Sequence, residues 1–303
     1  MRVVGQLLKF NRPSDNALQN LEKGQLFCQH YAAYNDPFEF WTRISSGIPD
    51  PDQEPERYLA ALRAWGFHYR TVAEAKSDKL IQESVDDYFD ECQSYAPPFE
   101  QMRRQMRISC FRAEANNLLM WSHYGDGLRG FCIAFDEDAI KGDDGGSYVL
   151  DVTYLDRPPR VDSFIYGVAW DQDWYSDVAI EEAEHAARAQ GRILRPDEVA
   201  MYEDSGAEAL RTMREIWQHV LATKPAEWRY ERERRLLVQT DMDDTRPLLR
   251  TYDRAAVKEV IVGERMPEDY RERLIAVMRE HYPDAPVRTA SRAEGVYSLS
   301  IKS

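Results

Sequence analysis

The sequence predicts an α+β fold, with a mixed, mainly antiparallel central sheet and helical insertions. Short apolar segments typical of strands recur along the chain, two long segments have a helical composition, and the two kinds do not alternate as in a parallel βαβ sheet. With 303 residues, 43% of them hydrophobic, the chain can bury a sizeable core. We expect a single domain over residues 1–303, with helical insertions at about 52–105 and 160–224.

The predicted strands lie on both sides of these insertions. Residues 7–10 and 25–29 flank a short helix that begins at Ser14 or Asp15 and ends at Gly24, residue types that suit an N-cap and a C′ position. Further strands are predicted at 107–112, 130–136, 147–154, 228–239, 257–263 and in the C-terminal VYSLSIKS.

The segments 130–136 and 147–154 are predicted to form a hairpin, joined by the turn-rich DAIKGDDGG. Helices are predicted at 55–66, 71–93, 174–190, 197–222 and 267–282, because these segments lack strand-like alternation. Gly191 and Pro196 separate the third helix from the fourth, and Pro225 ends the fourth.

The net charge of −14 is distributed unevenly, since residues 171–215 carry twelve acidic and five basic side chains. A negative field disfavours nucleic acid and anionic membranes as partners, whereas the acidic helices of 171–215 offer a contact surface to a protein partner. No apolar run is long enough for a transmembrane helix or a secretory signal. The four cysteines form no CxxC, so we expect reduced thiols and a cytoplasmic location.

Familiar cofactor and metal motifs are absent or out of context. The GDGLRG of residues 125–130 is a literal GxGxxG, but a helical segment precedes it and a strand follows, the reverse of what a dinucleotide fingerprint requires. We therefore interpret it as a turn between a helix and a strand. The six histidines are scattered and HExxH is absent, so no metal is predicted.

Two segments before residue 125 hold candidate binding residues. In NDPFE, Asn35 and Asp36 either form a structural corner with Phe38 in the core or face a ligand. In MWSHY, Trp121 and the neighbouring His123 and Tyr124 either pack in the core or present rings on which a planar ligand stacks. Aromatic side chains serve both purposes.

A third segment, WRYERERR, holds a pair of carboxylates. On a strand, Glu231, Glu233 and Arg235 would share one face, and the following LLVQT favours a strand. Adjacent carboxylates can act as an acid/base pair or bind a ribose. The alternative is a solvated, salt-bridged strand edge.

The order LKF, NDPFE, ISCF, MWSHYGDGLRGFCIAF and KPAEWRYERERR resembles a bacterial family catalogued as domain of unknown function 2971, over nearly the whole chain. Two departures are Leu128, where members often carry a histidine, and LKFN in place of YKYR. The resemblance assigns the family's shared residues to Lys9, Asn35, Asp36, Pro37, Glu39, Ser109, Trp121, His123, Tyr124, Gly130, Phe131, Lys224, Trp228, Glu231, Glu233 and Arg234.

The order of elements is also similar to that of ADP-ribosyltransferases, which implies NAD as co-substrate. Glu233 would then stabilise the oxocarbenium-like state and Glu231 would activate the acceptor. Lys9 or Arg12 would neutralise the pyrophosphate, Ser109 would support the site, and Tyr124 or Trp121 would stack on nicotinamide. Catalytic candidates are Glu233, Glu231, His123 and Ser109, and cofactor-binding candidates are Lys9, Arg12, Asn35, Asp36, Trp121, Tyr124 and Arg234.

The leading hypothesis is therefore an NAD-consuming transferase, a toxin or phage-defence effector whose partner is a small-molecule nucleotide or an unknown macromolecular acceptor. One alternative is a non-catalytic sensor or interaction protein. The other is a nuclease in which Asp36, Glu39, Glu231 and Glu233 bind a metal ion. The leading hypothesis requires the N-terminal segment, the MWSHY segment and the two glutamates to wall a common cavity.

Overall fold

The computed structural model describes residues 5–95, 97–142 and 145–302, and only the backbone of 201–205. The chain divides into two compact units, which are described separately. The sheet unit comprises Met1–Phe40, Glu100–Arg157 and Ala222–Ser303, and the helical unit comprises Trp41–Phe99 and Pro158–Leu221. That the whole chain is one domain stays a prediction.

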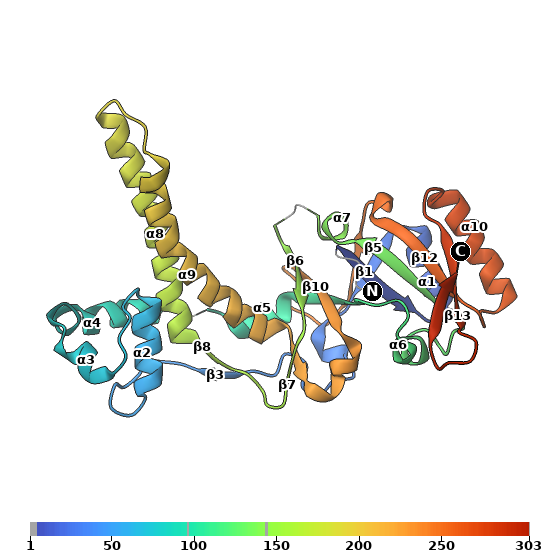
Figure 1. The fold of residues 1–303 in the computed structure, drawn as a ribbon, viewed down its shortest axis with the longest axis horizontal. Coiled ribbons are helices and arrows are strands. Elements are labelled where there is room, and N and C mark those ends of the chain that lie inside the picture. The colour runs from blue at the N-terminus through green and yellow to red at the C-terminus, as the bar shows by residue number, and fades with distance from the viewer. Residues whose placement is uncertain (1–4, 96, 143–144, 303) are drawn as a thin grey trace. The chain divides into compact units, whose positions relative to one another are not determined.

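The sheet unit contains an eight-stranded sheet in the order β14-β13-β12-β5-β1-β4-β10-β6 (Figure 1). Only β12 and β13 pair in parallel, so the predicted α+β class with a mixed, mostly antiparallel sheet is confirmed. The strands are β1 (Gln6–Asn11), β4 (Met106–Arg112), β5 (Phe131–Asp136), β6 (Ser147–Asp151), β10 (Glu233–Gln239), β12 (Val257–Gly263), β13 (Val287–Arg292) and β14 (Leu299–Lys302).

Shorter elements surround this sheet. Strand β2 (Gln25–Cys28) pairs with β11 (Leu248–Thr251), and β7 (Thr153–Leu155) pairs with β9 (Thr223–Pro225). The helices of the unit are α1 (Asp15–Glu22), α5 (Phe99–Gln105, which starts at the last residue of the helical unit), α6 (Leu118–His123), α7 (Glu137–Lys141) and α10 (Glu268–His281), with 3₁₀ turns η1 (Tyr31–Ala33), η3 (Ala226–Glu231) and η4 (Arg254–Ala256).

The two faces of the sheet have different partners. Helices α1 and α10 pack on the face that carries Phe111 and Leu236, where they form the larger apolar core. The opposite face carries Leu8 and packs against Trp121 of α6. Because side chains alternate along a strand, this second face also carries Arg112, Glu233 and Arg235, which face away from the larger core.

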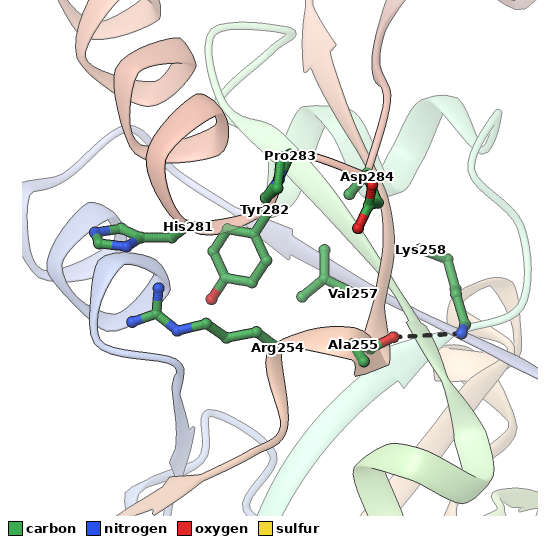
Figure 2. Close-up of a pocket in the computed structure, with 9 residues that line it drawn as sticks. Arg254, Ala255, Val257, Lys258, His281, Tyr282, Pro283 and Asp284 are labelled. Atoms are coloured by element: carbon green, nitrogen blue, oxygen red, sulfur yellow. Dashed lines mark hydrogen bonds between the residues drawn. The ribbon is translucent and has the colours of Figure 1, made fainter.

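The carboxyl end of α10 borders a cavity of about 390 Å³, which Arg254 and Tyr282 also line (Figure 2). Arg254 and Tyr282 donate hydrogen bonds to the carbonyls of Glu22 and Leu21 at the end of α1, and His281 is the last residue of α10. Cationic groups stabilise the carboxyl ends of helices. The place of Arg254 at this cavity therefore has a structural explanation.

The helical unit overlaps the two predicted insertions, whereas residues 100–105 and 222–224 of those insertions lie in the sheet unit. Its elements are β3 (Arg43–Ser45), α2 (Pro55–Ala64), α3 (Val72–Ser77), α4 (Lys79–Cys92), η2 (Gln93–Tyr95), β8 (Arg160–Asp162), α8 (Ser163–Ala189) and α9 (Pro196–Leu221). Helices α8 and α9 form a long hairpin (Figure 1), and α2, α4 and the start of α8 share an apolar core. None of the described helices is long and apolar enough to span a membrane.

Several predicted elements are wrong in detail. Strands β5 and β6 form no hairpin, because β5 pairs with β1 and β12 while β6 pairs with β10; α7 follows β5 directly, and residues 143–144 of the predicted turn lie outside the described residues. The predicted strand 147–154 is divided into β6 and β7. Asp78 caps α4 and so separates it from α3, which divides the predicted helix 71–93, and α8 begins at Ser163 because Asp162 caps it there.

The turn at residues 125–130 connects α6 to β5, as predicted, and it requires glycine. A Cβ on Gly130 would lie 2.0 Å from the carbonyl oxygen of Asn11, and a Cβ on Gly263 would lie 2.1 Å from that of Leu128. The amide of Gly263 donates to the carbonyl of Gly130 at 2.9 Å. The turn is therefore held between the ends of β1 and β12 by close backbone contacts.

Replacing Gly130 with alanine should lower the free energy of unfolding by about 2–3 kcal/mol, because the new methyl group meets a backbone oxygen that cannot rotate away. Urea unfolding followed by circular dichroism measures the change. The matched control is Gly146→Ala, whose Cβ would have its nearest neighbour at 3.9 Å. Equal stability of the two variants would contradict the tight packing of this turn.

Candidate functional site

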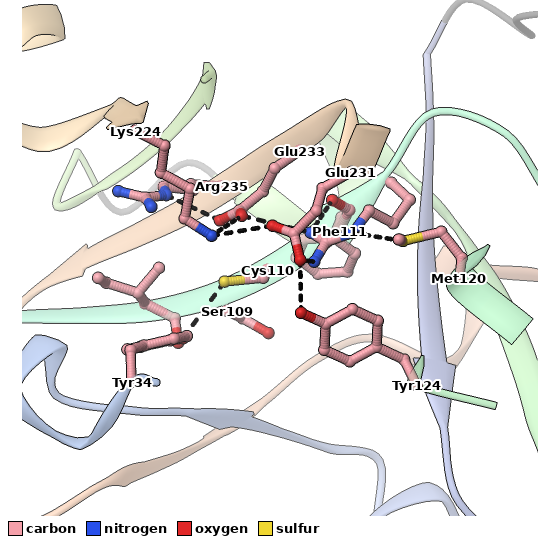
Figure 3. A network of polar contacts seen from close by, with 12 residues as sticks. Tyr34, Ser109, Cys110, Phe111, Met120, Tyr124, Lys224, Glu231, Glu233 and Arg235 are labelled. Carbon is pink, nitrogen blue, oxygen red and sulfur yellow. Dashed lines mark hydrogen bonds and ion pairs between the residues drawn. The ribbon is translucent and has the colours of Figure 1, made fainter. Parts of the chain in front are cut away.

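Six charged side chains meet on the sheet face that carries Glu233, and Figure 3 labels Lys224, Glu231, Glu233 and Arg235 among them. They come from the loop before β3, from β4, β9 and β10, and from the last residue of η3, so the site joins segments up to 196 residues apart. We call these residues the charge network: Glu39, Arg112, Lys224, Glu231, Glu233 and Arg235. All six are buried, and their three positive and three negative charges balance.

Lys224 of β9 joins the two glutamates. Its Nζ lies 2.9 Å from Glu231 Oε2 and 2.5 Å from Glu233 Oε2, and both carboxylates are fully buried. A shared cation is required at such a place, because two buried carboxylates held side by side repel each other. Lys224 therefore determines that Glu231 and Glu233 converge.

Arg112, the last residue of β4, contacts both glutamates from the neighbouring strand. Its guanidinium lies 3.2 Å from Glu231 Oε1 and 3.5 Å from Glu233 Oε2. The register places Arg112 directly opposite Glu233 across the β4–β10 ladder. Cross-strand neighbours on one face are close enough for such a pairing.

Arg235 extends the charge network to the NDPFE loop. Its guanidinium contacts both carboxylate oxygens of Glu39, at 2.6 and 2.9 Å, and its Nε donates to Glu233 Oε1 at 2.8 Å. The guanidinium also lies over the ring of Phe40 at 5.8 Å. This two-point contact fixes the loop on the sheet.

Tyr124 brings the MWSHY segment to the same place. Its hydroxyl donates to Glu231 Oε1 at 2.5 Å, and the Arg112 guanidinium lies 5.0 Å from the centre of its ring. Arg12 donates to the carbonyl of His123 at 3.0 Å. The three segments are thus in contact, but neither the N-terminal segment nor the MWSHY segment lines the cavity that borders Glu233, so the common cavity that the leading hypothesis requires stays a prediction.

The charges of the network shift one another's pKa values. Burial by itself would raise the pKa of Glu233, but the positive charges of Arg235, Arg112 and Lys224 outweigh it and lower that pKa well below its ordinary value. Burial would lower the pKa of Lys224, but Glu233 and the other negative groups raise it. Glu233 and Lys224 are therefore ionised at neutral pH.

The strand predicted for residues 228–232 is wrong. Residues up to Glu231 form the 3₁₀ turn η3, and Arg232 has a φ of 42°, a left-handed conformation that reverses the chain before β10 begins at Glu233. Glu231 and Glu233 therefore do not share a strand face. They converge because η3 packs against β9, whose Lys224 contacts both carboxylates.

Lys9 and Ser109 form a separate pair. Lys9 Nζ donates to Ser109 Oγ at 2.8 Å and lies 5.4 Å from the centre of the Phe111 ring. Ser109 and Phe111 project from the face of β4 opposite to Arg112. Burial lowers the pKa of Lys9. The sheet thus separates this pair from Glu233, contrary to the expectation that they share one site.

Two other predicted binding residues are structural. Trp121 is fully buried, its indole N–H donates to the carbonyl of Ala115, and its ring packs edge-on against Phe10, so neither face is available for stacking. Asp36 is buried and accepts from the amide of Phe38, which closes the predicted corner, although Phe38 itself is 43% exposed. Trp121 and Asp36 are therefore corrected from binding residues to structural ones.

Three predicted residues lie at the surface or nearer to it. Asn35 and His123 are exposed, and the His123 ring lies 6.2 Å from that of Tyr230. Arg234 lies on the sheet face opposite to Glu233, where it binds both oxygens of Glu137 at 2.7 Å and Asp151 at 2.6 Å. Of these three, Arg234 borders a cavity.

This cavity, which we call the β10 cavity, has a volume of about 650 Å³, a size that accommodates a small-molecule ligand. It is lined by Ala113, Glu114, Asp151, Val152, Tyr154, Arg229, Tyr230, Arg232, Glu233 and Arg234. Arg232 and Arg234 have acidic partners, whereas Arg229 is exposed and makes no ion pair among the described residues. The Arg229 guanidinium donates to the carbonyl of Tyr154 at 3.4 Å.

The glutamates do not favour a metal site. Within the described part of the chain, no group of three or more His, Cys, Asp or Glu side chains is arranged to hold a metal ion. Glu39, Glu231 and Glu233 are instead neutralised by protein cations at short range. The nuclease alternative required them to converge on a metal ion.

Sequence reasoning missed Arg112, Arg229 and Arg235 as site residues. Arg112 and Arg235 both border buried apolar runs, ISCF and LLV, and a cation at the end of a buried strand indicates a buried acidic partner. That signal was present in the sequence. No comparable pattern indicated Arg229, because its place at the cavity depends on the 3₁₀ turn.

Part of the chain matches the model of a protein family. Residues 120–236 match the model of a family described as protein of unknown function (DUF2971). The family resemblance is thereby confirmed for this segment, which contains Tyr124, Lys224, Glu231, Glu233 and Arg235. Neither curated proteins nor solved structures give a match to the chain, so the similarity to ADP-ribosyltransferases has no support from the fold.

Replacing Lys224 with methionine should lower the free energy of unfolding by about 3–5 kcal/mol, because it leaves two buried carboxylates with too little positive charge. Urea unfolding measures the loss. The control Arg188→Gln removes an exposed ion pair with Glu184 and should change stability by less than about 0.5 kcal/mol. A loss for Lys224→Met as small as the control's would show that Lys224 does not compensate the glutamates.

The lowered pKa of Glu233 predicts a specific acid sensitivity. As the pH falls below about 4.3, the ordinary value for glutamate, the unfolded chain takes up the proton first, so stability falls until the pH passes the folded pKa. The variant Glu233→Gln should lose less stability over that range than the wild type. Unfolding free energies at a series of pH values test this, and parallel pH profiles would contradict it.

Proposed function

We propose that the chain is an NAD-consuming enzyme of the ADP-ribosyltransferase type, with its nucleotide site in the β10 cavity. The observation that carries the proposal is the convergence of two buried glutamates, Glu231 and Glu233, on Lys224 beside this cavity. Cleavage of a ribosyl bond passes through an oxocarbenium-like state, which a fixed carboxylate stabilises.

The lining of the β10 cavity supports a nucleotide as ligand. Arg229, whose charge has no acidic partner among the described residues, fits a phosphate or pyrophosphate group. Tyr154 and Tyr230 add aromatic surface for a base or for nicotinamide. Lys9 has no place in this site, because it pairs with Ser109 on the sheet face opposite to Glu233. Trp121 has none, because it is fully buried in the core.

The reaction we propose breaks the C–N bond between nicotinamide and ribose, and its electron pair leaves with nicotinamide. An acceptor oxygen, of water or of a macromolecule, forms the new bond to the ribose carbon and gives up its proton to Glu231. Glu233 stabilises the positive charge that develops on the ribose. Because NAD is consumed rather than recycled, this activity suits a toxin or a phage-defence effector.

The proposal requires a conformational step. The side chains of Glu231 and Glu233 are fully buried in the structure, so a ribose reaches them only after η3 moves. Arg232, between η3 and β10, holds a left-handed φ, and strained residues of this kind often lie at mobile or functional segments. We propose that residues 226–232 open when the ligand binds.

Incubation of the purified protein with NAD should release free nicotinamide, measured by chromatography. Glu233→Gln should lower the rate at least about 100-fold, because it removes the stabilising charge. Arg229→Gln leaves the charge network intact and should raise KM for NAD several-fold with little change in kcat. The distant, exposed Arg279→Gln is the charge-matched control and should match the wild type.

Absence of nicotinamide release by the wild-type protein, with and without a cell extract as a source of acceptor, would overturn the proposal. Equal rates for the wild type and a folded Glu233→Gln variant would overturn the role of Glu233. Folding of each variant is checked by circular dichroism, because Glu233 also belongs to the charge network.

A further inference from the structure

One face of helix α8 carries exposed aromatic and acidic side chains. Trp170, Trp174, Asp177 and Glu181 recur at intervals of three or four residues, so they form one stripe along the helix. Trp170 is 40% exposed, with its ring also in contact with that of Tyr95 at 4.8 Å between centres, and Trp174 is 52% exposed. Asp177 and Glu181 are exposed as well. We call this stripe the Trp170–Glu181 face.

This face is not needed to hold the α8–α9 hairpin together. The hairpin closes through Ser176, which is buried against Gly206 of α9, where a Cβ would lie 2.3 Å from Ser176 Oγ. At 3.6 residues per turn, Ser176 lies roughly 120–160° around α8 from the two tryptophans. The Trp170–Glu181 face therefore points away from α9.

Charge distinguishes the helical unit from the sheet unit. The helical unit contains 24 acidic and 12 basic residues, whereas the sheet unit contains 29 and 27, so almost all of the net charge of −14 lies in the helical unit. Asp177 and Glu181 make no ion pair among the described residues, in contrast to Glu184, which pairs with Arg188. The acidic end of the stripe is therefore not neutralised within α8.

We propose that the Trp170–Glu181 face binds a basic segment of another protein. Lys and Arg side chains of such a segment would contact the tryptophan faces by cation–π interaction and pair with Asp177 and Glu181. Exposed tryptophans are typical centres of binding energy in protein interfaces. The negative charge of the unit repels the phosphates of nucleic acids and anionic membranes.

The length of the Trp170–Glu181 face determines how long a partner segment must be to cover it. From Trp170 to Glu181 the helix rises by roughly 16 Å, at 1.5 Å per residue. A partner helix of about 11 residues, or an extended segment of about five, spans the same length. The two tryptophans lie at one end of the stripe and the two carboxylates at the other, so the partner needs apolar or cationic contacts for the first and cations for the second.

The test uses a fluorescently labelled 12-residue peptide that alternates arginine and leucine, with fluorescence anisotropy as the readout and the full chain as the receptor. We expect binding that weakens as salt is added, because exposed charges are screened. Trp170→Ala/Trp174→Ala should weaken binding at least 10-fold. Asp177→Asn/Glu181→Gln should weaken it and reduce its dependence on salt.

Matched controls distinguish binding at this face from nonspecific attraction to the negative charge of the helical unit. Asp86→Asn/Asp87→Asn removes the same charge from exposed positions of α4, and Tyr148→Ala removes an exposed ring from the sheet unit; both should bind as the wild type does. Failure to bind the peptide at low salt, or equal effects of the controls, would overturn the proposal. Binding of a single-stranded oligonucleotide instead, or self-association abolished by Trp170→Ala/Trp174→Ala, would assign the face to a different occupant and overturn it as well.

Discussion

The contact between Lys224 and the two carboxylates of Glu231 and Glu233 is the constraint on which the centre of the sheet unit depends. Buried charges are tolerated only when they are paired at short range, and here each additional partner is itself charged. Arg112 and Arg235 compensate the same glutamates, and Glu39 compensates Arg235 in turn. The contacts that surround Glu231 and Glu233 therefore link β9, η3, β10, β4 and the NDPFE loop.

Structure that depends on local sequence could be predicted, whereas structure that depends on long-range contacts such as this one could not. The α+β class, most strands and the helical segments follow from local periodicity and capping, as at Ser14 before α1. Strand partners do not: β5 pairs with β1 and β12 because of long-range burial, which no local pattern records. Likewise, the LLVQT that follows Arg235 indicated a strand from residue 228, but residues 226–231 form a 3₁₀ turn in which Glu231 pairs with Lys224 of β9.

The candidate site was predicted in part for the same reason. Charge complementarity brings Tyr124, Glu231 and Glu233 together, but Tyr124 and Glu231 do not line the cavity that borders Glu233, whereas the leading hypothesis requires a common cavity. Lys9 and Ser109 lie across the sheet, since strand alternation separates residues that are close in the chain order of the motifs. The two units also differ in character: charges are balanced in the sheet unit and mostly negative in the helical unit, which separates a proposed catalytic role from a proposed binding role.

The most direct test of the central contact is a double-mutant cycle between Lys224 and Glu233. Unfolding free energies of Lys224→Met, Glu233→Gln and the double variant give the coupling between the two side chains, separated from their contacts with the remaining network. A buried pair at 2.5 Å should couple by at least about 1.5 kcal/mol, with the double variant more stable than the sum of the single losses implies. Additive losses would show that the two charges do not hold the site together.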